Sequence, residues 1–159
     1  MPEWLVSGFS LAGLAVAVLQ QVPGIVRAIR PPRVDPFAGN SGPLVVELLE
    51  KTFGVGSLLL IVVVFARVPV SPALSAVFLS GAFVVLGAYY ALYIVYYRGV
   101  TRLAVLLGMA AFPPLAFVLV ALSQGNYPAL ITSVVFAAVH VGLTYSNFGA
   151  GRLQTTEPM

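Results

Sequence analysis

Two acidic residues and one histidine are the side chains of this sequence best suited to chemistry in an apolar setting. Glu47 and Glu50 lie just ahead of an apolar run, and the sole histidine, His140, lies inside another. An ionisable group within a membrane is costly, so a functional site is the default hypothesis for it. His140 could line a ligand site, or it could be a neutral imidazole bonded to a neighbouring helix.

The acidic pair allows two interpretations. Glu47 and Lys51 are four residues apart, in the order that favours an ion pair along a helix. With Arg27 and Arg30 of the preceding segment they would form a polar collar at the membrane surface, which is the interpretation that the sequence favours. In the alternative, Glu47 or Glu50 points into the bundle as a proton or cation site.

A run of tyrosines, GAYYALYIVYYR, ends the third apolar segment. Tyr89, Tyr93 and Tyr96 recur at helical spacing and would share one face of a helix. Tyr96 and Tyr97, close to the end of the segment, are expected in an aromatic belt at the membrane interface. Tyr89 and Tyr93 lie deeper, where their hydroxyls need partners on another helix or on a ligand.

Five apolar segments must position these side chains. Hydrophobic residues make up 60% of the 159 and charged residues only 8%, against about 25% charged in soluble domains, so lipid must be the main solvent. A bilayer-crossing helix takes about 20 residues, and the second apolar run reaches that length only by extending back through the acidic pair. The sequence predicts an all-α integral membrane protein, a five-transmembrane-helix bundle in residues 1–148 followed by a polar tail at 149–159, with spans at residues 4–26, 44–66, 71–97, 103–123 and 128–146.

The basic residues predict the orientation of this bundle. With the N-terminus outside, only Arg67 faces outward, and the other basic residues fall on the cytoplasmic side, as the positive-inside rule requires. The net charge of +3 therefore indicates topology in a multi-pass protein of the cell membrane, and no nucleic-acid partner is expected. The cytoplasmic set is Arg27, Arg30, Arg33, Lys51, Arg98, Arg102 and Arg152.

In this topology the polar residues of different segments share one depth, in the cytoplasmic half of the bundle. Gln20 and Gln21 of the first segment lie at the same level, whereas the outer half is almost purely aliphatic. The sequence therefore predicts a polar cavity that opens towards the cytoplasm. Its candidate ligand-binding residues are Tyr89, Tyr93, His140, Glu47, Glu50 and Asn147.

An enzyme is the least favoured class of function, and no catalytic residue, metal site or cofactor is expected. The chain has no cysteine, and its deep segments offer no carboxylate to orient a nucleophile or a metal. Phe136 and His140 resemble the FxxxH element of intramembrane CAAX-type proteases. The paired glutamates and second histidine that those enzymes also need have no counterpart here, so proteolysis is not inferred.

Two functions remain open. The first is the binding or transport of an apolar or weakly polar small molecule through the cytoplasm-facing cavity, by a homo-oligomer because five helices are few for a complete pathway. The alternative is a non-catalytic accessory subunit of a larger membrane complex, in which the tyrosines are protein–protein contacts. The two differ in whether the region around Tyr89, Tyr93 and His140 encloses space or is filled by side chains.

Overall fold

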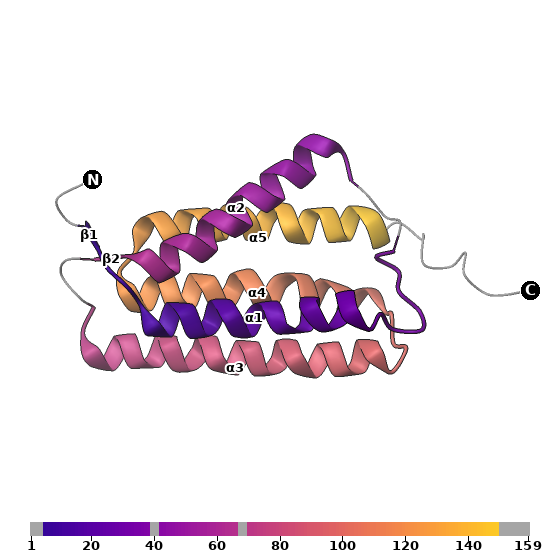
Figure 1. Ribbon diagram of the computed structural model, residues 1–159, viewed down its shortest axis with the longest axis horizontal. Coiled ribbons are helices and arrows are strands. Elements are labelled where there is room, and N and C mark those ends of the chain that lie inside the picture. Colours follow the sequence, from indigo (N-terminus) through magenta and orange to yellow (C-terminus); the bar gives the residue numbers. More distant parts are fainter. Residues whose placement is uncertain (1–4, 39–41, 67–69, 150–159) are drawn as a thin grey trace, which may run out of the picture.

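The computed structural model describes residues 5–38, 42–66 and 70–149, and these form five helices and one pair of short strands. Trp4, Arg67, Arg152 and most of the predicted tail lie outside the described residues. Figure 1 shows α2 (Leu44–Val63) inclined to the other helices, which run side by side, with its N-terminal end lifted away from them. The helices are α1 (Leu11–Ile29), α2 (Leu44–Val63), α3 (Pro72–Tyr97), α4 (Leu103–Gln124) and α5 (Tyr127–Phe148).

The predicted helical architecture is confirmed, and four helices, α1, α3, α4 and α5, are long and apolar enough to cross a membrane. This indicates a membrane protein. Helix α2 is not among the four, because Glu47, Glu50 and Lys51 all lie in its first half. The predicted span at residues 44–66 is therefore a helix over most of its length, but it lacks the composition of an ordinary membrane span.

The N-terminal segment is extended where the sequence predicts a helix. Strand β1 (Leu5–Ser7) pairs antiparallel with β2 (Val64–Ala66), with Val6 opposite Phe65. Helix α1 begins only at Leu11, because Ser10 caps it by accepting a hydrogen bond from the amide of Gly13 at 3.0 Å. A hydroxyl that binds the third amide of a helix favours a start at that point. The predicted first span, which starts near residue 4, is corrected accordingly.

Side-chain amides secure the C-terminal end of α2. A helix end leaves its last carbonyls without helical partners. Here Gln124 donates to the carbonyl of Ile61 at 2.9 Å and to the Ser10 hydroxyl at 2.9 Å, and Asn126 donates to the carbonyl of Leu60 at 2.8 Å. These bonds tie the turn between α4 and α5 to the ends of α1 and α2.

Helix α4 is the centre of the bundle. Its buried residues run along most of its length, from Leu106 to Ser123, and include Pro113 and Pro114. Figure 1 shows α4 between α3 and α5, and α1 runs along α4 and contacts it. Large apolar side chains on the outer helices point outward, such as Val84, which is 73% exposed, and Ile131, which is 62% exposed. Such faces suit contact with lipid.

Helices α1 and α2 approach most closely at Gly13. A Cβ at this position would overlap the backbone carbonyl of Ile61. We expect Gly13→Ala to cost about 1–3 kcal/mol of stability, as overpacking does elsewhere, measured as a lower midpoint of thermal unfolding in detergent. Gly24→Ala is the matched control in the same helix, because a Cβ there meets nothing within 4 Å. Equal midpoints for the two variants would contradict the close approach.

Candidate functional site

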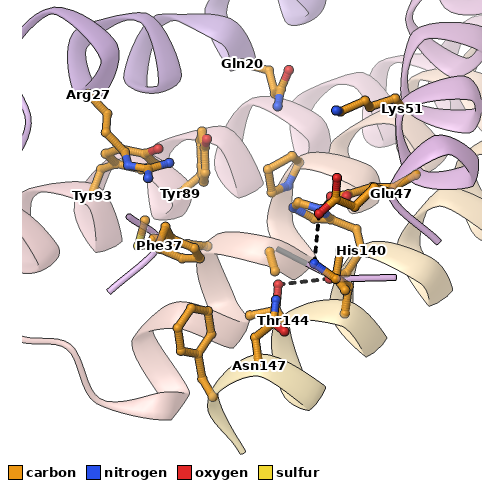
Figure 2. A pocket seen from close by; sticks show the side chains of 17 residues that line it. Gln20, Arg27, Phe37, Glu47, Lys51, Tyr89, Tyr93, His140, Thr144 and Asn147 are labelled. Carbon is orange, nitrogen blue, oxygen red and sulfur yellow. Dashed lines mark hydrogen bonds and ion pairs between the residues drawn. The ribbon is translucent and has the colours of Figure 1, made fainter. Parts of the chain in front are cut away.

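A cavity of about 430 Å³ lies at the end of the bundle where α2 is lifted away. Residues of all five helices and of the loop between α1 and α2 line it. Figure 2 shows their side chains converging on one space. The structure brings together around this cavity all six residues that the sequence selected, namely Glu47, Glu50, Tyr89, Tyr93, His140 and Asn147.

His140 and Glu50 pair directly across the wall of the cavity. The Nδ1 atom of His140 on α5 contacts the Oε1 atom of Glu50 on α2. The imidazole also stacks on the Phe136 ring, with centroids 5.1 Å apart, and Thr144 donates to the His140 carbonyl at 2.9 Å. The pair is half-buried, with 29% of the His140 side chain and 20% of the Glu50 side chain exposed. It joins the lifted half of α2 to α5.

The acidic pair makes contacts other than those that the surface-collar interpretation expects. Both carboxylates line the cavity, and neither pairs with an arginine of α1. Glu47 accepts a hydrogen bond from the amide of Gly42 at 2.8 Å, which fixes the chain just ahead of α2. The sequence could not show this, because the direction in which a helix turns its charged face depends on the tilt of α2 against α5.

Arg27 instead pairs with Asp35, a residue that the sequence analysis did not select. Arg27 Nε lies 2.8 Å from Asp35 Oδ2, and its guanidinium lies 5.0 Å from the centre of the Phe37 ring. The other Asp35 oxygen accepts from the Tyr96 hydroxyl at 2.7 Å and from the amide of Phe37 at 3.0 Å. The loop after α1 therefore folds back onto the bundle, and Phe37 becomes part of the cavity wall.

The environment of Asp35 lowers its pKa. Burial acts to raise the pKa of this carboxyl, but the hydrogen bonds from Tyr96, Arg27 and the Phe37 amide outweigh burial, so the pKa lies below its ordinary value. Asp35 is therefore ionised at neutral pH and neutralises the charge of Arg27. One signal was available in the sequence, since Asp35 is the only acidic residue between Glu3 and Glu47 and lies in the first loop among arginines and prolines.

The tyrosines of α3 divide into two groups. Tyr89 and Tyr93 line the cavity and pack edge to face, with ring centroids 5.2 Å apart. Tyr96 is fully buried and bonded to Asp35, so its expected place in an interfacial belt is wrong. The hydroxyl of Tyr97 donates to the carbonyl of Arg30 at 3.1 Å, and so bonds α3 to the end of α1.

The cavity wall combines charged, amide and aromatic side chains. Gln20 lines the cavity, and Figure 2 shows its amide beside Lys51. The Oε1 atom of this amide is buried and has no hydrogen-bond partner in the protein. Among the described residues that line the cavity, Lys51 is the one basic side chain without an ion pair, because Arg27 pairs with Asp35 and His140 pairs with Glu50. Among the described residues, no group of three His, Cys, Asp or Glu side chains could hold a metal ion.

No protein-family model, curated protein or solved structure matches this chain.

Asp35→Asn tests the loop anchor. We expect it to cost about 1.5–3 kcal/mol at neutral pH, the range for hydrogen bonds to a charged group. Because the folded-state pKa lies below the ordinary value of 3.8, the contribution is fully present above about pH 4 and is lost as the pH falls through the lower, folded-state pKa. The difference in unfolding midpoint between wild type and variant should therefore stay constant down to about pH 4 and then shrink.

Tyr96→Phe is the graded control for this experiment. It removes one donor to Asp35 and leaves the Arg27 contact in place, so its loss of stability should be smaller than that of Asp35→Asn. A wild-type midpoint for Asp35→Asn at pH 7 would contradict the role of the anchor.

A double-mutant cycle tests the contact between α2 and α5. We expect Glu50→Gln and His140→Ala to be coupled by about 0.5–3 kcal/mol in unfolding free energy, as residues in direct contact are. The control cycle combines Glu50→Gln with Tyr145→Phe, because Tyr145 is on the same helix as His140 but is 58% exposed. Additive effects in the first cycle, within the error of the control, would show that the pair does not hold α2.

Proposed function

We propose that this chain is a multi-pass protein of the cell membrane that binds or transports a small molecule through its cavity. The observation that carries the proposal is the space itself. Tyr89, Tyr93 and His140 line a partly open cavity of about 430 Å³, a volume within the usual range for small-molecule sites of about 300–1,000 Å³. In an accessory subunit that uses these residues only for packing, side chains would fill the region.

The geometry of α2 supports a fifth crossing. Its 20 residues span about 30 Å as a helix, which matches the hydrocarbon thickness of a bilayer. Its acidic residues turn towards the cavity, and charged groups within membranes almost always face the interior of a bundle or a water-filled space. With the basic residues on the cytoplasmic side, the N-terminus is outside and the cavity opens to the cytoplasm.

The chemistry of the wall supports a narrower class of ligand than the apolar or weakly polar molecule expected from the sequence. Glu47 and Glu50 would favour a positive charge, and the rings of Tyr89 and Tyr93 could contact a cation or an apolar body. These features favour a small amine with an apolar part, and a transport pathway would require a homo-oligomer of this five-helix chain.

Native mass spectrometry of protein extracted gently from its own membrane tests the proposal. We expect the wild type to retain a discrete non-lipid mass. His140→Ala removes one wall, and Asn147→Trp occupies the cavity, so both should reduce the retained fraction about tenfold or more. Val84→Trp is the control for added bulk, because Val84 lies on the outer face of α3, and it should retain the mass.

The same spectra distinguish the alternative. Stoichiometric association with different chains and no small mass would make the protein an accessory subunit, and the proposed binding function would be rejected. Retention of the mass by both cavity variants would place the ligand elsewhere on the protein and would reject this cavity as the site.

A further inference from the structure

A second hollow lies on the outside of the bundle, in the seam between α1 and α3. It encloses about 340 Å³. Val22, Pro23 and Val26 form one side, and Tyr90, Ile94 and Tyr97 form the other, with Arg98 at one end. Val22, Val26 and Ile94 are 36%, 44% and 56% exposed. The groove is therefore open to the solvent around the bundle, which is lipid for helices of this composition.

The polar groups along this groove are already bonded within the protein. The hydroxyl of Tyr90 donates to the carbonyl of Leu19 at 2.7 Å, and the hydroxyl of Tyr97 donates to the carbonyl of Arg30 at 3.1 Å. Pro23 has no amide hydrogen to offer to Leu19, the residue four positions earlier. The wall between Tyr90 and Tyr97 consequently presents hydrocarbon and ring faces, which suit an apolar occupant.

Arg98 gives the groove one charged end. It caps α3 at the turn that leads to α4, it is exposed, and it makes no ion pair among the described residues. Its position fits a phosphate at the membrane interface, since arginine binds phosphate through two parallel N–H groups. Arg30, Arg33 and Arg102 lie at the same end of the helices and add positive charge there.

The length of the groove fits one leaflet. Tyr90 and Arg98 are eight residues apart on α3, or about 12 Å along the helix. The hydrocarbon of one leaflet is about 15 Å deep, half of the bilayer core. A chain that enters beside Arg98 would therefore reach Tyr90 without leaving its own leaflet.

We infer that this groove binds one acyl chain of an anionic phospholipid, with the phosphate of that lipid on Arg98. A partner helix is a poorer fit, because interfaces between membrane helices favour Gly, Ala, Ser and Thr. The groove presents valine, isoleucine, proline and tyrosine instead. The inference is independent of the ligand proposed for the cavity, although Tyr93 borders both spaces.

Lipid binding to the delipidated, full-length protein in detergent tests the inference. The probes are phosphatidylglycerol and phosphatidylcholine with identical acyl chains, and native mass spectrometry measures the affinity for the first bound lipid. We expect the wild type to bind phosphatidylglycerol about five-fold more tightly, the effect of one basic residue near an anionic headgroup. Arg98→Gln should abolish this preference, and Val26→Trp, which fills the groove, should weaken the binding of both lipids.

Two controls match these variants. Arg33→Gln removes the same charge from an exposed position in the loop after α1, and Val84→Trp adds the same bulk to another outer face. Val84→Trp should bind as the wild type does. Arg33→Gln should keep most of the preference for phosphatidylglycerol, because Arg33 adds charge at this end but does not line the groove. Ile94→Trp, on the opposite side of the groove, replaces Val26→Trp if that variant unfolds.

Three results would overturn the inference. They are equal affinity of the wild type for the two lipids, an unchanged preference in Arg98→Gln, and unchanged affinity in the folded groove variant, Val26→Trp or Ile94→Trp. Release of a second copy of the chain by Val26→Trp, with lipid binding unchanged, would identify the groove as a protein interface instead.

Discussion

The need to pair every polar group within an apolar bundle determines most of this structure. A backbone carbonyl or carboxylate that water cannot reach must find its partner in the protein. Gln124 and Asn126 meet this need for the carbonyls at the end of α2, and Asp35 meets it for Arg27 and Tyr96. The first set of bonds holds one end of the bundle, and the second holds the loop at the other end.

The cavity follows from how differently the two ends of α2 are held. At its C-terminal end, Gly13 lets α1 approach the backbone of Ile61 directly, and amide side chains fix the last carbonyls. Towards its N-terminal end, α2 rises away from the other helices, and the contact between Glu50 and His140 spans the widening space. The charged half of α2 thus lines a wedge-shaped space. The aliphatic half could not line such a space, because it would leave an empty apolar volume.

The sequence predicted those features that depend on one segment at a time. Apolar length and turn residues located the helices, and depth along each helix was enough to select the six residues around the cavity. Which polar side chains bond to one another was not predictable, because these pairings depend on how the loop at residues 31–38 folds back. Asp35 therefore went unnoticed and Tyr96 was assigned to the interface. The extended segment at Leu5–Ser7 was missed because its partner, Val64–Ala66, is far away in the chain.

Helix α1 contributes few buried residues, yet it borders both the cavity and the outer groove. Pro23 explains how so exposed a helix is positioned. Its missing amide hydrogen frees the carbonyl of Leu19, and Tyr90 of α3 satisfies that carbonyl at 2.7 Å. This bond fixes α1 against α3 at mid-length, so that Gln20 faces the cavity while Val22 and Val26 face the groove. Through this bond, Pro23 helps to place α1 between a polar cavity inside the bundle and an apolar groove outside it. The ring of Tyr93 lies between the two spaces.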